Sequence, residues 1–422
     1  MVYGLQVFTP CRLGRFTRLL MLAVLVAAVH TLWTRQAVRA STDDEVRALW
    51  VQRASLTTPE SIAQMVETAR LAGFNTLLVQ VRGRGDAYFR NSVEPHAVAL
   101  ASQSDHFDPL ATVLKLAREA GLRVHAWVNV NLVANVHELP LARKHLVYRH
   151  PEWLMVPRSL TREIARIDPD RPEYVEKLVR TVRTLSAQVE GLYVSPIPDG
   201  AAAYTTSVIE DLARRYDVDG IHFDYIRYPN EEFDYSPAAL SRFRRDVIPD
   251  LTRSERNHFD ARLRMEPTIY ADAFPERWRE FRRDRLTRLL IRLRAAVKSR
   301  RPNATVSAAV FPDARDAVSR RLQDWPLWTS RGLLDVICPM AYTTDPAAFR
   351  AQIESARQLA GDKAVWAGIG AYRLSSSETI ESIMTAREIG ARGVVLFSYD
   401  NLATLPGQSG ALSDIGRAAF NH

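Results

Sequence analysis

Short runs of hydrophobic residues, many of them β-branched, alternate along the chain with longer amphipathic stretches. Eight runs are apolar at most positions, which is typical of parallel strands covered on both faces. The expected strands are Val46–Val51, Thr76–Val81, Leu122–Val128, Gly220–Asp224, Thr305–Val310, Leu334–Met340, Ala364–Ile369 and Gly393–Phe397. The stretches between them can each hold a helix, so the pattern predicts repeated strand–helix units.

Several of the intervening helices have recognisable ends. Thr58-Pro59 is expected to begin one helix and Gly73 to follow its last turn, while Asp108-Pro109 and Gly121 frame the next. A polar N-cap, a proline in the first turn and a glycine beyond the end are the usual order of helix boundaries. Longer helices are expected over Glu276–Ser299 and Ser377–Ile389.

Eight strand–helix units in about 375 residues suit one α/β domain, a (β/α)8 TIM barrel. About ninety residues separate the third and fourth strands and about eighty the fourth and fifth, so long insertions are expected after strands 3 and 4. In a barrel they would wall a cleft at the strand ends. The alternative, a doubly wound sheet, needs a glycine-rich turn after its first strand, and Trp50-Val51-Gln52-Arg53 has no glycine.

The first forty residues differ from the rest. Arg12, Arg15 and Arg18 precede an apolar run of fifteen residues, Leu19–Trp33, and small residues follow at Val38-Arg39-Ala40-Ser41. These are the parts of a secretory signal, and the run is shorter than the roughly 18 residues of a stable membrane span. We predict a signal peptide at residues 1–40; an uncleaved N-terminal membrane anchor is the alternative. In both cases the barrel domain, residues 41–422, is exported to the periplasm or the cell exterior.

Removal of these forty residues changes the charge and cysteine arguments. They contain five arginines and no acid, so the formal net charge falls by five, from +8 to +3. Nucleic-acid binding thereby loses its main support, and we predict no nucleic-acid partner. Cys338 becomes the only cysteine, which excludes an intrachain disulfide, and its apolar strand indicates a packing role.

The run Asp219–Pro229, at the end of the fourth strand, is the richest in chemically active residues. Alternation along the strand puts His222 and Asp224 on the same, barrel-facing side. Catalytic groups of TIM barrels lie at the C-terminal ends of strands, which makes Asp224 the first catalytic candidate. His222, Arg227 and Tyr228 are candidates for substrate binding. The alternative for Asp224 is a structural ion pair with Arg227 that fixes the loop.

Strands two and three also end in polar or aromatic residues. The second ends at Arg82, a candidate for substrate binding, and a loop with two glycines then presents Asp86. The alternative for these two is a structural Arg82–Asp86 pair. The third strand ends with His125, Trp127 and Asn129, a set that suits sugar recognition through ring stacking and amide hydrogen bonds. The alternative for His125 is a buried core residue.

The later strands add weaker candidates. Tyr342 follows the sixth strand and Asp400 the eighth, and both are predicted to bind substrate, with rim packing or a loop cap as the alternative. The ten histidines show no HxxxH spacing and the two cysteines no CxxC spacing, so we predict no metal. Since nucleophile-elbow and phosphate-loop motifs are also missing from the sequence, we predict no cofactor.

In order, the motifs resemble those of the glycosyl hydrolase-like 10 family of exported bacterial TIM barrels. They are Arg47-Ala48-Leu49-Trp50-Val51, Gln80-Val81-Arg82 with Gly85-Asp86-Ala87-Tyr88, Phe107-Asp108-Pro109-Leu110, His125-Ala126-Trp127 with Asn129, Asp219–Pro229, Asp324-Trp325 and Pro339-Met340-Ala341-Tyr342. The resemblance covers roughly residues 45–400. It implies a glycoside hydrolase of the bacterial envelope, with the glycan strands of peptidoglycan as one substrate of the family.

The same strand is similar to that of chitinase-type hydrolases, which carry Asp-Gly-x-Asp-x-Asp-x-Glu. Asp219-Gly220 and Asp224 fit this pattern. His222 replaces the middle aspartate, however, and Ile226 stands at the position of the acid glutamate. The resemblance therefore leaves the proton donor open.

Glycoside hydrolysis usually needs two carboxyl groups on opposite sides of the bond. We predict Asp224 as one, with Arg227 lowering its pKa, which favours a nucleophile or charge stabiliser. We predict Asp86 as the other, because the ends of strands two and four can face each other across the barrel. The reserve candidates are Asp313, Glu231 and Asp400.

Together these observations favour a hydrolase of envelope or extracellular polysaccharide. One alternative is a catalytically inactive glycan-binding barrel, which the absent glutamate supports. Another is a non-hydrolytic enzyme on the same fold, such as a lyase or transglycosylase, because fold alone does not fix the reaction. Two carboxyl groups about 5–10 Å apart would favour hydrolysis, and a lone Asp224 among aromatic residues would favour binding.

Overall fold

The computed structural model describes residues 1, 4, 45–404 and 410–420. Its contacts divide the chain into two units, Met1–Glu45 and Val46–His422, and the second contains the whole barrel. Apart from residues 1 and 4, the predicted signal peptide or anchor at 1–40 lies outside the described residues. Among the residues that are described, no helix has both the length and the apolar character needed to cross a membrane.

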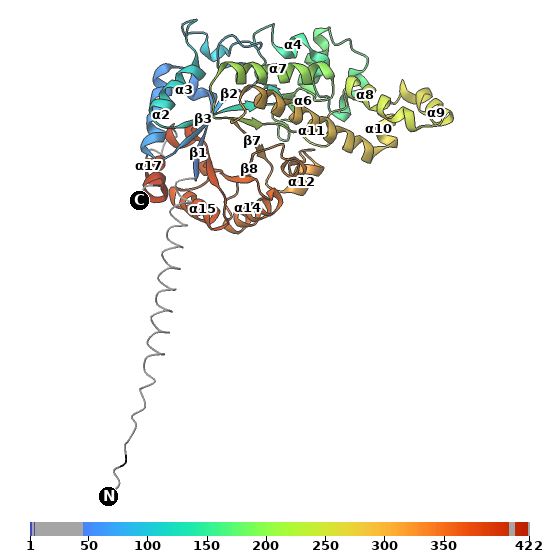
Figure 1. Cartoon of the computed structure of the whole chain (residues 1–422). Coiled ribbons are helices and arrows are strands. Elements are labelled where there is room, and N and C mark those ends of the chain that lie inside the picture. The colour runs from blue at the N-terminus through green and yellow to red at the C-terminus, as the bar shows by residue number, and fades with distance from the viewer. Residues whose placement is uncertain (2–3, 5–44, 405–409, 421–422) are drawn as a thin grey trace. The chain divides into compact units, whose positions relative to one another are not determined.

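Eight parallel strands close into a barrel in the order β1-β10-β9-β8-β7-β6-β3-β2 (Figure 1). Their bounds are β1 (Val46–Val51), β2 (Thr76–Arg82), β3 (Arg123–Asn129), β6 (Gly220–Asp224), β7 (Thr305–Val310), β8 (Val336–Ala341), β9 (Ala364–Ile369) and β10 (Gly393–Phe397). Each end lies within two residues of the predicted run. The predicted TIM barrel is confirmed, and closure of the sheet excludes the doubly wound alternative.

Helices cover the outside of this barrel (Figure 1). Apart from the additional helices of the two insertions, they are α2 (Pro59–Leu71), α3 (Pro109–Glu119), α7 (Asp199–Arg215), α11 (Pro275–Arg300), α12 (Ala314–Ser319), α13 (Trp325–Ser330), α14 (Pro346–Ala360), α15 (Ser376–Glu388), α16 (Tyr399–Thr404) and α17 (Ala411–Ile415). Thr58 and Asp108 cap α2 and α3 as predicted, because their side chains accept hydrogen bonds from N–H groups of the first turn. Gly73 and Gly121 follow the two helices with φ of 74° and 70°, the left-handed conformation that glycine allows.

Both predicted insertions are present. The first, between β3 and β6, adds an antiparallel strand pair and short helices: β4 (Leu132–Ala134), α4 (Leu146–Arg149), α5 (Thr161–Ile164), α6 (Pro172–Thr184) and β5 (Leu192–Tyr193). The second, between β6 and β7, adds α8 (Pro237–Val247), α9 (Arg253–Leu263) and α10 (Ile269–Ala273). Figure 1 shows these three helices reaching beyond the ring around the barrel. Together with the first turns of α11 they form a separate small hydrophobic core, which includes Phe243, Tyr270 and Trp278.

The inside of the barrel is filled by side chains from alternate strand positions. Trp50, Trp127, Cys338 and Trp366 belong to one buried cluster to which six of the eight barrel strands contribute, all but β6 and β7. The ladder pairs Trp127 with His222, and Asn129 with Asp224 in the same register. Because parallel strands hold this register firmly, their C-terminal residues are fixed at one level around the opening.

Candidate active site

A cleft of about 320 Å³ lies at the C-terminal ends of the barrel strands. The side chains that line it are Trp50, Gln52, Arg53, Gln80, Arg84, Trp127, Asn129, Asp224, Tyr225, Arg227, Ala309, Met340, Tyr342 and Phe397. Asp224 is the one carboxylate in this set. Besides Asp224, the cleft brings together four of the predicted substrate-binding residues, Trp127, Asn129, Arg227 and Tyr342. A fifth, His222, does not line the cleft but is hydrogen-bonded to Trp50, which does.

Asp224 is the last residue of β6 and is only 7% exposed. Its Oδ1 accepts hydrogen bonds from the backbone N–H of Tyr225 at 2.6 Å and from Nη1 of Arg227 at 3.3 Å. Its Oδ2 accepts a hydrogen bond from Nε1 of Trp127 at 3.2 Å. A carboxylate oxygen can accept about two hydrogen bonds, so Oδ1 is occupied while Oδ2 keeps a lone pair for a ligand.

Burial raises the pKa of Asp224, and this effect exceeds the lowering by Arg227 and by the hydrogen bonds to the carboxylate. The prediction that Arg227 keeps this pKa low is therefore wrong in its net direction, because removal from water costs the charged form more than one cation returns. A raised pKa favours the protonated carboxyl group, the form that can give a proton to a leaving group.

Arg227 holds Asp224 from within the same cleft. The guanidinium is 4% exposed, pairs with Asp224, and also lies 3.4 Å from Oε1 of Glu190. Glu190 in turn accepts a hydrogen bond from the hydroxyl of Tyr193 at 2.6 Å. Burial raises the pKa of Glu190, but Arg227 and Tyr193 together hold it below its ordinary value. The ion pair proposed as the structural alternative for Asp224 thus exists, and it lies in the cleft wall.

Tyr225 turns the chain sharply after the strand. Its φ of 51° lies in the left-handed region, which a bulky residue rarely adopts. The turn is held by hydrogen bonds from the N–H of Val130 to the carbonyl of Asp224 (2.7 Å) and from the N–H of Asn131 to that of Tyr225 (3.1 Å). Strained backbone of this kind is frequent at functional sites, where surrounding structure maintains it.

Aromatic rings form much of the cleft wall. Tyr342 meets Trp50 nearly edge to face, with ring centroids 6.2 Å apart, and packs on Phe397 at 5.5 Å. Trp127 contacts Phe397 at 6.3 Å. Such a wall presents apolar ring faces beside a few polar groups, which suits binding of sugar rings.

A sequence model of the glycosyl hydrolase-like 10 family matches residues 45–384, which is more than half of the chain. The chain belongs to the glycosyl hydrolase-like 10 family. The resemblance inferred from the motifs is confirmed, and the matched residues include seven of the eight barrel strands and the whole cleft wall except Phe397.

Similar proteins include glycosyl hydrolase YngK of Bacillus subtilis, 21% identical over 335 residues that make up 72% of this chain and 55% of that protein. Glycosyl hydrolase DigH of Escherichia coli strain K12 is 23% identical over 330 residues, 69% of this chain and 62% of that protein. The chain therefore spans less than two thirds of the length of either relative.

Among solved structures, the glycoside hydrolase domain of PgaB (BpsB) from Bordetella bronchiseptica is similar to this chain. The TM-score is 0.60 at 17% sequence identity, and the match covers 88% of this chain and 98% of that domain. At this identity the likeness demonstrates the shared barrel fold and nothing finer.

Two histidines of this glycosyl hydrolase-like 10 chain lie below the cleft rather than on its wall. Nε2 of His222 accepts a hydrogen bond from Nε1 of Trp50 at 3.2 Å, so the proton of the ring is on Nδ1, which donates to Oγ of Ser307 at 2.9 Å. Burial lowers the pKa of both His222 and His125 to about 3. Both rings are therefore neutral near pH 7, and His222 acts by positioning Trp50.

Gly220, in the family motif, is required for a steric reason. A Cβ at Gly220 would lie 2.4 Å from Nδ1 of His125, so the buried histidine is accommodated only because this position has no side chain. The neighbouring Asp219 accepts a hydrogen bond from the N–H of Val124 at 2.8 Å and joins the two strands. Asp219 and Gly220 thus build the barrel, whereas Asp224, Tyr225 and Arg227 of the same motif line the cleft.

Arg82 and Tyr228 lie outside the cleft wall. The Arg82 guanidinium forms a two-point ion pair with Glu94, at 2.7 and 2.6 Å, and donates to the carbonyls of Asn129 and Val130. The partner of Arg82 is therefore Glu94, where a pair with Asp86 was the expected alternative. The hydroxyl of Tyr228, fully buried, donates to a backbone carbonyl at 3.3 Å.

None of the further carboxylate candidates lines the cleft. Asp86 lies in a neighbouring pocket of about 280 Å³, where its Oδ1 accepts a hydrogen bond from the N–H of Arg84 at 2.8 Å. Asp400 accepts hydrogen bonds at 2.7 Å from the N–H of Gln52 and from the hydroxyl of Ser55, and so fixes the loop after β1. The two others have local partners: Asp313 caps α12 and Glu231 lies 3.8 Å from Arg320.

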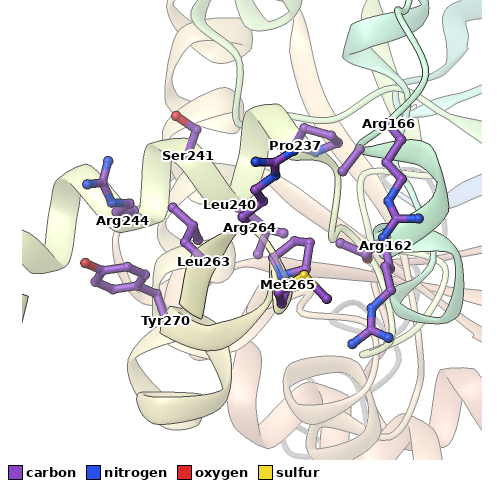
Figure 2. A pocket seen from close by; sticks show the side chains of 13 residues that line it. Arg162, Arg166, Pro237, Leu240, Ser241, Arg244, Leu263, Arg264, Met265 and Tyr270 are labelled. Carbon is purple, nitrogen blue, oxygen red and sulfur yellow. The ribbon is translucent and has the colours of Figure 1, made fainter. Parts of the chain in front are cut away.

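A larger pocket, of about 730 Å³, lies between the two insertions (Figure 2). Figure 2 shows four arginine side chains, Arg162, Arg166, Arg244 and Arg264, around an apolar floor that includes Met265. No acid lines it, and no predicted site residue lies in it. Within residues 45–404 and 410–420, no three His, Cys, Asp or Glu side chains are grouped closely enough to hold a metal ion.

Proposed function

We propose that this chain is a glycoside hydrolase that acts on polysaccharide of the bacterial envelope or the cell exterior, with peptidoglycan glycan strands as the first candidate substrate. The observation that carries the proposal is Asp224, a buried carboxyl group at the C-terminal end of a barrel strand in an aromatic cleft. The names of the similar proteins YngK and DigH agree with this reaction class.

In this proposal Asp224 is the proton donor. Its Oδ2 gives a proton to the glycosidic oxygen as the bond from that oxygen to the anomeric carbon breaks. Arg227, Trp127 and the N–H after Asp224 then stabilise the carboxylate that remains. Water adds its hydroxyl to the anomeric carbon and returns a proton to Asp224, so the enzyme is restored.

The attacking group in this proposal is not a side chain of the cleft. Because a single carboxylate lines the cleft, the nucleophile is water or a group of the substrate itself, as in glycosidase families with substrate assistance. Asp86, which the sequence predicted as the acid partner of Asp224, lies in the adjoining pocket, and its catalytic role stays a prediction.

The experiment is a product analysis. The mature protein is incubated with purified peptidoglycan, with glycan strands freed of peptides and with chitin, and the products are identified by mass spectrometry. We expect new reducing ends from at least one substrate with the wild type and none with Asp224→Asn. Equal products from both proteins would exclude Asp224 as the catalytic group.

The second candidate function is a glycan-binding barrel without catalysis. The lone carboxylate among aromatic residues favours it, since most glycoside hydrolases use two. Calorimetric titration with the same oligosaccharides separates the two functions: binding without any product over days would favour the binding protein.

Export is a further proposal. The basic residues and the apolar run Leu19–Trp33 support a cleaved signal peptide, and we expect protein recovered from the envelope to begin near Ser41. N-terminal sequencing measures this directly. Recovery of Leu19–Trp33 in the membrane fraction would instead identify an anchor.

A further inference from the structure

The charges around the Asp224 cleft do not balance. Three arginines, Arg53, Arg84 and Arg227, line it together with one acid, Asp224. Arg227 is neutralised by Asp224 at 3.3 Å and by Glu190 at 3.4 Å. In the part of the chain that the structure describes, neither Arg53 nor Arg84 has a carboxylate within ion-pair distance. The cleft therefore carries two cations without counterions.

Arg84 is the less satisfied of the two. Its Nη1 is buried and has no hydrogen-bond partner in the described structure. Asp86, which could neutralise it, instead accepts a hydrogen bond from the backbone N–H of Arg84. Burial lowers the pKa of Arg84, and the positive charge of Arg53 acts in the same direction. An unpaired, partly desolvated guanidinium costs free energy that a bound anion would recover.

Arg53 is held beside Arg84 by neutral contacts. Its Nη1 donates a hydrogen bond to Oε1 of Gln80 at 2.9 Å. A Cβ at Gly83 would lie 2.6 Å from the same nitrogen, so the glycine lets the guanidinium lie directly against the main chain. These contacts fix the direction of the guanidinium without cancelling its charge.

Both arginines also line the adjoining pocket of about 280 Å³ that contains Asp86. They therefore lie at the junction of two hollows, and the cleft on one side of this junction holds Asp224. A chain of linked sugars bound at Asp224 could continue past them into the second hollow.

We propose that Arg53 and Arg84 form a subsite for the carboxylate of an acidic sugar, next to the sugar whose bond is cleaved at Asp224. This inference rests on the proposed hydrolase function and specifies its substrate class. The planar guanidinium groups match a carboxylate through paired N–H donors, better than they match a neutral hydroxyl group. A glycan of neutral sugars alone would leave both cations unpaired.

The test compares two ligands that differ in this one group. Peptide-free peptidoglycan strands carry a lactyl carboxylate on every second sugar, and chemical reduction converts it to an alcohol without changing the backbone. Binding is measured by calorimetry with full-length Asp224→Asn, and with the same protein carrying Arg84→Gln in addition. The matched control is Arg264→Gln, which removes an arginine from the insertion pocket of Figure 2.

We expect the acidic strands to bind at least about tenfold more tightly than the reduced strands. Arg84→Gln should weaken binding of the acidic strands by about 10- to 100-fold, the range for a lost hydrogen bond to a charged group, and abolish the preference. Arg264→Gln should keep it. If Arg84→Gln does not fold, Arg53→Gln carries the same test.

Equal affinity for both ligands, or an equal loss with both in Arg84→Gln, would overturn the subsite. Cleavage assays with the wild type keep this result separate from the hydrolase proposal. Cleavage of acidic and reduced strands with the same kcat/KM contradicts the subsite alone. Preferential binding of acidic strands without any cleavage supports the subsite and contradicts the hydrolase.

Discussion

Two hollows of the molecule differ strongly, and the smaller one holds Asp224, the proposed catalytic residue. The insertion pocket measures about 730 Å³ and the barrel cleft about 320 Å³. The larger pocket is formed by helix surfaces, and its side chains include Met265, which is 60% exposed. The smaller cleft is formed by strand ends, and its carboxylate, Asp224, is 7% exposed and bound by three donors.

The difference shows what a barrel contributes to a site. Residues on neighbouring parallel strands are held in register, so Asn129 and Asp224 are positioned by the backbone ladder before any side-chain contact is made. In the insertion pocket, Arg162, Arg166 and Arg264 extend from exposed positions, and their directions are set by solvent-facing helices and loops. Precise positioning of reacting groups, rather than pocket volume, is what catalysis requires.

The largest expected effect is the loss of catalysis in Asp224→Asn. Acid–base groups contribute about 10²–10⁴-fold, and asparagine keeps the shape while removing the transferable proton. We expect turnover to fall by that factor and the melting temperature to change by only a few degrees. Thermal melts and hydrolysis assays on the same samples measure both. The control is Asp313→Asn, an exposed helix cap outside the cleft, with turnover near wild type.

The opposite pattern would return Asp224 to a structural role. In that case Asp224→Asn would lower the melting temperature strongly while its activity per folded molecule stays normal. The carboxylate would then stabilise Arg227 and the loop, and the cleft would have no more claim to catalysis than the insertion pocket.

Next in size is a stability effect at a second buried arginine. The Arg82–Glu94 pair has side-chain exposures of 1% and 0% and lies outside the cleft wall. Glu94→Gln should lower the free energy of unfolding by about 3 kcal/mol, because it leaves Arg82 buried without its countercharge. Urea denaturation followed by circular dichroism gives the value. A normal stability would mean that the two carbonyl contacts of Arg82 suffice.

Arg82 and Arg227, two buried arginines, show what the sequence could predict and what it could not. The strand bounds were predictable because strands covered on both faces are apolar throughout, and Asp224 because functional groups of barrels lie at strand ends. The pair of Arg227 with Asp224 was also open to prediction, since the two are three residues apart. The other partners, Glu94 of Arg82 and Glu190 of Arg227, lie in loops outside the motifs. No local pattern marks those partners, since the contacts form only when the chain is folded.

The wrong prediction for the pKa of Asp224 has the same cause, because this pKa also depends on the folded chain. Its sequence neighbour Arg227 argues for a lowered pKa, but the net shift is upward because of burial, which depends on the whole surrounding fold. His222 was likewise expected to face substrate, since it shares the strand face of Asp224. It lies one layer deeper, under Trp50, because two residues along a strand correspond to one layer of the barrel interior.

A pH profile gives a third, smaller effect. If protonated Asp224 is the acid, turnover is high below its pKa and falls as pH rises through that value, which burial raises above the ordinary 3.8. Arg227 lowers this pKa, so Arg227→Gln should move the falling limb of the profile to higher pH. The logarithm of kcat against pH for both proteins shows the shift. A limb that moves to lower pH would exclude Asp224 as the titrating acid.

Asp86→Asn should have a weaker effect than Asp224→Asn. Asp86 accepts a hydrogen bond from the N–H of Arg84 and lines the adjoining pocket, so we expect a loss of turnover of about tenfold or less. Initial rates on the substrate identified by product analysis measure it. A loss as steep as that of Asp224→Asn would establish Asp86 as the second carboxyl group that the sequence predicted. The Asp224 cleft and the adjoining Asp86 pocket would then form one active site.

The smallest effect is expected in the insertion pocket itself. Met265→Ser replaces an exposed thioether on the pocket floor. Like Met265, Arg264 lines this pocket and not the Asp224 cleft. Both Met265→Ser and Arg264→Gln should change turnover less than twofold and the free energy of unfolding by about 0.5 kcal/mol or less, as surface substitutions usually do. Rates on long and short oligosaccharides should be compared, because a pocket that binds distant sugars would alter KM for long chains alone. Such a change would mean that the insertion pocket takes part in substrate binding. The Asp224 cleft and the insertion pocket would then differ in catalysis but share in substrate recognition.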